Sequence, residues 1–227
     1  MKKISLLFCF VIIPLTLILC SKLPGRAYYF TSSLVIIESL IPFFLAFEKR
    51  RPQGREMSVI AVLCALAVTA RVAIPLPGFK AIFAIIMLSG IAFGAEAGFL
   101  VGAVSALVSN FFYGQGPFTP WQMLAYGLAG LAAGFVFKKK LLPQKPMVMG
   151  IFGFFCVLLF VGPLLDTASI FIMLPEPSWE NAWPLYLSGL PMNFSQGICT
   201  LLTILIFGKP LLEKLDRVKK QYGMLVD

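Results

Sequence analysis

The chain has 227 residues, of which 59% are hydrophobic and 13% are charged, and its formal net charge is +9. A soluble domain carries about twice this share of charged residues, so the composition excludes a soluble globular protein and indicates a polytopic membrane protein without a separate soluble domain. His is absent, and the five Cys lie in or beside apolar runs without a C-x-x-C pair. We therefore expect neither a metal site nor a disulfide.

Apolar runs along the chain predict an all-α integral membrane protein with eight spans. They are expected at residues 1–19, 28–47, 57–74, 81–93, 97–112, 121–137, 147–174 and 185–207. The first is interpreted as an uncleaved span in preference to a signal peptide, and the seventh as tilted or broken near Gly162 and Pro163. The chain thus divides into two N-terminal spans with a basic loop (1–56), a six-helix membrane core (57–208) and a basic amphipathic tail (209–227).

The distribution of basic residues predicts how these spans are oriented. With the N-terminus inside and eight spans alternating, fifteen of the 19 Lys and Arg residues lie on the inner side, whereas Lys22, Arg26, Arg71 and Lys80 lie outside. This bias follows the positive-inside rule and places both termini in the cytoplasm. It also accounts for the basic net charge through attraction to an anionic inner leaflet, without a nucleic-acid partner.

The outer side then carries three loops, at residues 75–80, 114–120 and 175–183. The second is a tight turn with two glycines and two prolines, and non-helical backbone at membrane depth survives only where protein buries it or a watery cavity adjoins it. Amides and aromatic rings at this level predict a pocket for a mostly neutral, partly planar small molecule. The candidate substrate-binding residues are Phe79, Lys80, Asn110, Gln115, Gly116, Thr119, Trp121, Gln122, Tyr126 and Asn193. Taken singly, a tryptophan here is more typical of the interfacial aromatic belt.

Ala61 and Ala65 form a small-x-x-x-small pair on the third span. Small residues let helices approach closely in lipid, which leaves two interpretations open: packing inside this protein, or docking of another membrane subunit. Glycine pairs with the same spacing are expected to serve internal packing; they are Gly90 and Gly94, Gly98 and Gly102, and Gly130 and Gly134.

Two acidic residues, Glu38 and Asp166, lie within apolar segments. Acids inside a membrane are costly and typically functional, so they support a rival hypothesis, a stand-alone ion-coupled secondary transporter. The absence of a visible repeat between the two halves weakens that hypothesis, and a non-transporting scaffold is a third alternative. The chain has no G-x-x-x-x-G-K-[ST] phosphate loop, so it is not expected to bind ATP itself.

Residues 57–207 resemble the substrate-binding S components of energy-coupling factor (ECF) transporters, which import vitamins into bacteria. The resemblance rests on the segments SVIAVLCALAV, IIMLSGIAFGAEAGFLVGAVSALVSNFF, GQGPFTPWQMLAYGLAGLAAG and LSGLPMNFSQGICT. It implies six membrane helices with both ends inside and a ligand site on the outer side, roofed by loops. Among the branches of the family, the chain looks most like those for cobalamin-type compounds.

The same resemblance implies a role for Ala61 and Ala65: their helix contacts the membrane coupling subunit of an energising module that also has two ATPase subunits. The protein would be a substrate-capture subunit in the bacterial cell membrane and not an enzyme. It would need no cofactor of its own, because ATP is used by the partner subunits. The resemblance gives no role to the two N-terminal spans.

Overall fold

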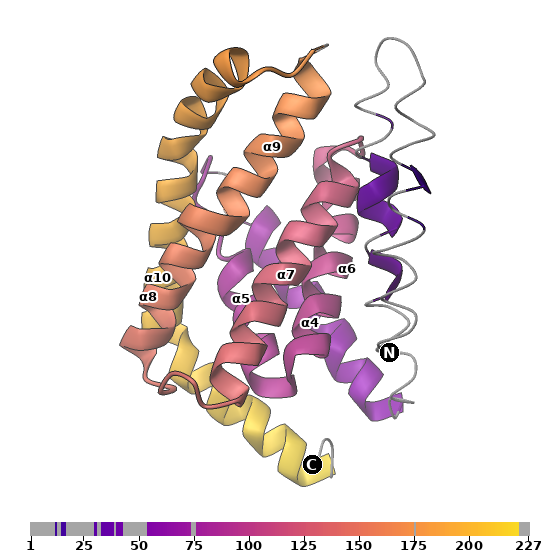
Figure 1. Ribbon diagram of the computed structural model, residues 1–227. Coiled ribbons are helices and arrows are strands. Elements are labelled where there is room, and N and C mark those ends of the chain that lie inside the picture. The colour runs from indigo at the N-terminus through magenta and orange to yellow at the C-terminus, as the bar shows by residue number, and fades with distance from the viewer. Residues whose placement is uncertain are drawn as a thin grey trace.

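The structure, a computed structural model, describes residues 54–73, 76–174 and 176–222, with short pieces of the N-terminal region at 12, 15–16, 30, 33–38 and 40–42. The helices are α4 (Gly54–Val72), α5 (Ile82–Phe93), α6 (Ala95–Tyr113), α7 (Thr119–Lys138), α8 (Pro146–Cys156), η2 (Val157–Val161), α9 (Gly162–Met173) and α10 (Trp179–Tyr222). Because α8, η2 and α9 form one continuous rod, the core between residues 54 and 222 consists of six helical rods (Figure 1). The predicted all-α core is confirmed, whereas the two N-terminal spans lie mostly outside the described residues.

Four of the described helices are long and apolar enough to cross a membrane. They are Ala95–Tyr113, Thr119–Lys138, Pro146–Met173 and Trp179–Gln221. The boundaries of α4 to α7 agree with the predicted spans to within three residues at every end.

Helix α5 is the centre of the bundle. All of its 12 residues are buried, and it contacts α4, α6, α7, α8 and α10. A helix that is apolar on every side is stable only when it is surrounded, and here protein surrounds it on all sides. At 1.5 Å per residue it is about 18 Å long, well short of the roughly 30 Å of a bilayer's hydrocarbon core.

Glycines bring α5, α6 and α7 into backbone contact. A Cβ added to Gly90 would lie 2.1 Å from the carbonyl oxygen of Gly130, and one added to Gly98 would lie 2.5 Å from the same atom. A Cβ added to Gly134 of α7 would lie 2.6 Å from the backbone nitrogen of Ala95 of α6. Internal packing of these glycines is therefore confirmed. Gly94 alone connects α5 to α6 with φ +98°, a conformation that favours glycine.

The seventh predicted span continues as one rod, but it contains a π-helical turn just before Pro163. Pro163 has no N–H and its ring crowds the carbonyl of Leu159, so an ordinary α-helical ladder cannot continue unchanged through this point. The wider turn of η2 between α8 and α9 accommodates the proline. Directly beside it, Gly162 packs against α10, where an added Cβ would lie 2.3 Å from the side-chain carbon of Asn193.

The start of α10 differs from the expectation of a loop through residue 183. The helix begins at Trp179, because Ser178 and Asn181 cap it reciprocally. The N–H of Ser178 donates to Asn181 Oδ1 at 2.8 Å, and the N–H of Asn181 donates to Ser178 Oγ at 3.4 Å. This arrangement resembles a capping box with Asn in place of Glu. Trp183 therefore belongs to the helix and not to a loop.

The end of α10 also differs from the expectation of a span ending at Phe207. The helix continues to Tyr222, and its 44 residues reach about 66 Å, roughly twice the thickness of the hydrocarbon core. Leu211 and Leu215 pack against the core, and Figure 1 shows this part, in yellow, turning beneath the bundle. The predicted amphipathic tail is thus a continuation of the last span.

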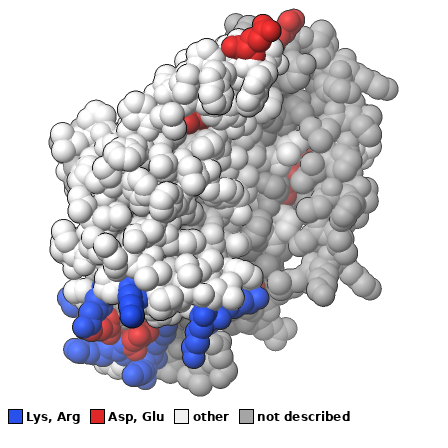
Figure 2. Space-filling model, turned by 60° about the vertical axis from the view of Figure 1, so that its left-hand side comes forward, with Lys and Arg blue, Asp and Glu red and all other residues white. Residues whose placement is uncertain are grey.

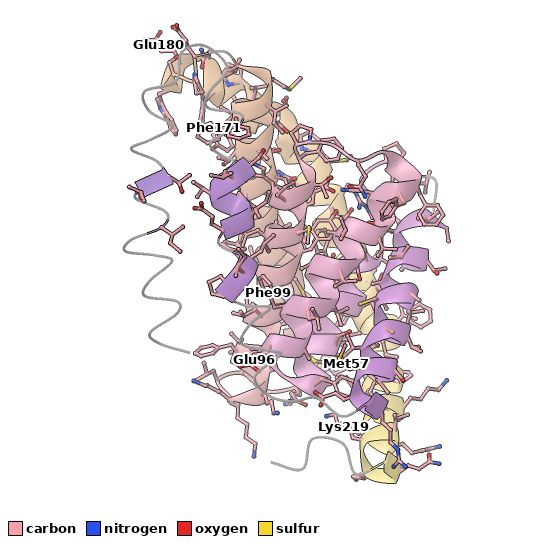
Figure 3. The ribbon with its side chains drawn as sticks, turned by 90° about the vertical axis from the view of Figure 1, so that its right-hand side faces the viewer. Met57, Glu96, Phe99, Phe171, Glu180 and Lys219 are labelled. Carbon is pink, nitrogen blue, oxygen red and sulfur yellow. The ribbon has the colours of Figure 1, made fainter. Side chains whose placement is uncertain are left out.

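Charged residues separate between the two ends of the molecule. Figure 2 shows a wide, almost uncharged surface between a lower end, where the Lys and Arg side chains in view gather with some acidic ones among them, and an upper end that shows acidic side chains alone. Lys219 and Glu180 mark these two ends in Figure 3. The separation agrees with the orientation predicted from the basic loops, so the lower end is termed the inner end and the upper end the outer end below.

Candidate functional site

Arg71, in the last turn of α4, is the centre of a polar cluster at the outer end. Its Nη1 donates to the Ser109 hydroxyl and, at 2.9 Å, to Asn110 Oδ1. Its guanidinium carbon lies 5.1 Å from the ring centroid of Tyr113 and 5.5 Å from that of Tyr126, close enough for cation–π attraction. Sequence reasoning counted Arg71 only as an outer charge. A lone arginine at the end of an apolar span was the signal that could have identified it.

Asn110 connects α6 to α7. Its side chain is fully buried, and its Nδ2 donates to Thr119 Oγ1 at 3.1 Å and to Gln122 Oε1 at 2.8 Å. With Oδ1 already accepting from Arg71, both donors and one lone pair of this amide are used within the protein. Asn110 therefore positions its neighbours.

The loop between α6 and α7 is held by side-chain hydrogen bonds. Thr119 Oγ1 donates to Gln115 Oε1 at 2.9 Å and accepts from the N–H of Gly116 at 3.2 Å. Gln115 Nε2 donates back to the carbonyl oxygen of Leu107 at 2.9 Å. Three of the candidate residues thus form one closed turn beside the Arg71 cluster.

A second loop, residues 76–80, lies between α6 and α10 at the same end. Lys80 Nζ donates to the Tyr113 hydroxyl at 3.2 Å, and Gln196 Nε2 of α10 donates to the Lys80 carbonyl. Gly78 sits against α10, where an added Cβ would lie 2.7 Å from Met192 Sδ. The loop, which also contains the candidate Phe79, therefore bridges the Arg71 cluster and α10.

Asn193 lies in a different group, between α9 and α10. Its Nδ2 donates to Asp166 Oδ2 at 2.8 Å. Thr167, the next residue after Asp166, shares a hydrogen bond of 2.8 Å with Tyr186 of α10. An added Cβ at Gly189 would lie 2.4 Å from Asp166 Oδ1, so this glycine leaves room for the carboxylate. The structure thus brings Asn193 to Asp166, whereas its neighbour Met192 faces the 76–80 loop.

Trp121 and Tyr126 are buried candidates with different surroundings. Trp121 stacks on Phe171 of α9 at a centroid distance of 5.9 Å and lies in an apolar cluster with Phe99. Figure 3 shows Phe171 in the outer half of the molecule. Tyr126 packs edge-on to Phe83 at 4.6 Å, beneath Arg71. Tyr126 therefore belongs to the Arg71 cluster, whereas Trp121 faces α9.

The outer cluster places amide, hydroxyl and cationic groups beside aromatic rings, and Tyr113 and Gln115 are exposed at its surface. Such a surface suits a small polar molecule with a planar ring, which would use stacking and hydrogen bonds together. Among the residues described, no group of three or more His, Cys, Asp or Glu is arranged to hold a metal ion.

Both alanines of the small-residue pair, Ala61 and Ala65, are exposed on α4. The adjoining side chains of Val62 and Leu66 are also exposed, at 66% and 41%. This face is therefore not covered by the rest of the described protein.

A comparison with protein families agrees with these features. The family model described as "ECF-type riboflavin transporter, S component" matches residues 53–217, a stretch that contains five of the six rods in full and α10 as far as Arg217. No curated protein and no solved structure matches the chain significantly. The family match includes both loops of the outer cluster and the exposed face of α4. The chain therefore belongs to the family of ECF-type riboflavin transporter S components.

Proposed function

We propose that this protein captures a vitamin at its outer end and delivers it to an ATP-driven ECF energising module. The observation that carries the proposal is the Arg71 cluster, in which residues of α6 and α7 surround one cation of α4 that lies within 5.5 Å of two tyrosine rings. The family match covers every element that contributes to it. The Asp166–Asn193 pair lies near this region, because α10 carries Asn193 and also contacts the 76–80 loop through Gln196.

Riboflavin is the first substrate that we propose, because the description of the matched family names it. Its planar ring system with carbonyl and N–H edges suits a site built of tyrosines and amides. The cobalamin-type substrate predicted from sequence stays the second candidate. A corrinoid is far bulkier and needs a wider opening between the 76–80 and 114–120 loops.

The exposed face of α4 supports the docking half of the proposal. Ala61 and Ala65 lie four residues apart on one side of the helix, and their small side chains permit another membrane helix to reach backbone contact. The partner would be the transmembrane coupling subunit of the module. Its two ATPase subunits would consume the ATP for which this chain has no phosphate loop.

Ligand binding to the purified protein tests the first half of the proposal. Riboflavin should raise the unfolding temperature in proportion to ln(1 + [L]/Kd), and its fluorescence should change on binding, whereas cobalamin at equal concentration should do neither. Stabilisation by cobalamin alone would reassign the substrate. Stabilisation by neither compound would contradict a vitamin site for these two classes.

Uptake by cells distinguishes the ECF importer from an ion-coupled carrier that would use Asp166 or Glu38. Collapse of the proton gradient with ATP maintained should leave uptake intact, because the energy comes from the ATPase subunits. Uptake that stops with the gradient while ATP is present would favour the carrier.

A further inference from the structure

An apolar groove of about 730 Å³ runs between α7 and α8 on the side of the molecule. Leu128 and Ala132 of α7 form one wall, Phe152 and Phe155 of α8 the other, and Leu142 of the connecting segment closes the inner end. Its lining is apolar throughout, and the side chain of Phe155 remains 51% exposed. In a membrane this groove faces the acyl chains of lipid.

Both walls of the groove end in a lysine. Leu128, Ala132 and Phe135 of α7 and Lys139, which caps the helix, follow one another at helical spacing along a single face. Lys139 Nζ lies 4.2 Å from the Phe135 ring centroid. On the other wall, Lys145 directly precedes the first turn of α8. The inner mouth of the groove is therefore cationic.

The connection between these lysines adds a third positive charge. Lys140 is exposed, as are Lys139 and Lys145, and among the described residues none of the three forms an ion pair with a carboxylate. The N-terminus of α8 points its first N–H groups at the same place, which further favours an anion there. The apolar groove and the cationic mouth thus adjoin.

The length of the groove matches one leaflet of a bilayer. From Leu128 to Lys139 the helix rises about 16 Å, close to half of the ~30 Å hydrocarbon core. The acyl chain of a lipid whose head group contacts Lys139 would therefore reach the middle of the membrane at Leu128. The lysines stand at the inner end, where the leaflet is anionic.

From these features we propose that the groove binds one anionic phospholipid of the inner leaflet. One acyl chain would lie between α7 and α8, and the phosphate would contact Lys139, Lys140 and Lys145. A phospholipid satisfies the apolar groove and the cationic mouth together. A zwitterionic lipid would fill the groove without using the positive charge.

Native mass spectrometry of the full-length protein in mixed micelles of phosphatidylglycerol and phosphatidylcholine tests the charge. The wild type should retain one phosphatidylglycerol in preference. The triple variant Lys139→Gln, Lys140→Gln and Lys145→Gln should lose that preference, by about fivefold for each lysine removed. The matched control replaces Lys209, Lys214 and Lys220 of α10 by Gln, which removes the same charge from the same end, and it should retain the preference.

Filling the groove tests the acyl chain separately. Ala132→Trp leaves the charge unchanged and should reduce retention of both lipids, and Leu142→Asn, in the exposed connection, should do the same if the first variant does not fold. Inorganic phosphate should not displace the lipid. Equal loss of preference in both triple variants, unchanged retention in the groove variant, or displacement by phosphate would overturn the proposal.

Discussion

Arg71 illustrates how one side chain orders the outer end of the molecule. It starts on α4, donates to Ser109 and Asn110 of α6, and lies against Tyr126 of α7. A guanidinium can hold several acceptors in fixed directions and still present its face to aromatic rings, which a lysine ammonium cannot do. The same residue thus fixes the relative positions of three helices and sets the positive charge of the site.

Removal of either partner of the Arg71–Asn110 contact should lower stability by about 1–3 kcal/mol, because the other partner keeps a buried group unsatisfied. The double variant Arg71→Ala with Asn110→Ala should cost less than the sum, with a coupling of about 0.5–3 kcal/mol. Thermal unfolding of the purified variants measures this, and Arg217→Ala, at the exposed inner end of α10, is the control. Strictly additive losses would contradict the contact.

The outer location of the residues around Arg71 could be predicted from the sequence, whereas their contacts with one another could not. The outer location of Arg71, Asn110, Thr119 and Gln122 follows from charge and turn signals within their own segments. Their contacts with one another depend on how α4, α6 and α7 pack, and no pattern within a single segment predicts this packing. Asn193 was placed with the same group, but the π-turn η2 changes the helical phase before α9 and directs Asp166 toward it.

Helix α4 combines a buried face and an exposed face with different chemistry. Leu63 and Ala67 are buried against the core, whereas Ala61 and Ala65 are exposed. The small side chains of Ala61 and Ala65 on the exposed face suit close approach by a second helix.

The double variant Ala61→Trp with Ala65→Trp should fold and bind its ligand, because both positions are exposed. It should no longer co-purify with the ATPase module, because the indoles prevent backbone contact. The matched control is Leu202→Trp with Ile206→Trp, an exposed pair at the same spacing on α10. Intact co-purification of the alanine variant, or lost ligand binding, would argue against this face as the docking site.

The helix boundaries that sequence predicted best have strong local signals. Gly94 ends α5 with a positive φ, as glycine after an apolar run typically does. The start of α10 was missed because residues 175–183, with two acidic residues and two tryptophans, resemble a loop. The reciprocal cap of Ser178 and Asn181 starts the helix within this stretch. The local pattern past Lys209 indicates an amphipathic tail, but its continuity with the last span depends on tertiary packing of Leu211.

At the scale of the whole molecule, the separation of charge between the two ends gives the protein one orientation in the membrane (Figure 2). The inner end contains the C-terminal part of α10, where Lys219 Nζ lies 5.3 Å from the ring centroid of Phe93. The outer end contains the Arg71 cluster. The proposed capture site and the basic surface thus lie at opposite ends of the molecule.

Cysteine labelling of whole cells should reveal this orientation. A membrane-impermeant maleimide should label Glu176→Cys in intact cells, whereas Leu141→Cys, whose native side chain is 61% exposed, should react only after permeabilisation. The parent protein, with Cys64 and Cys199 buried, is the control for background reaction. Labelling of both variants from outside would show that the predicted topology is wrong.

The short central helix α5 has a consequence for how the protein is made. An isolated helix of about 18 Å leaves polar backbone ends within the hydrocarbon, where nothing satisfies them. Since Gly94 alone separates α5 from α6, the two can enter the bilayer together as a helical hairpin. During biogenesis α5 would therefore acquire a stable transmembrane position only once α6 and α7 have been synthesised and have closed around it.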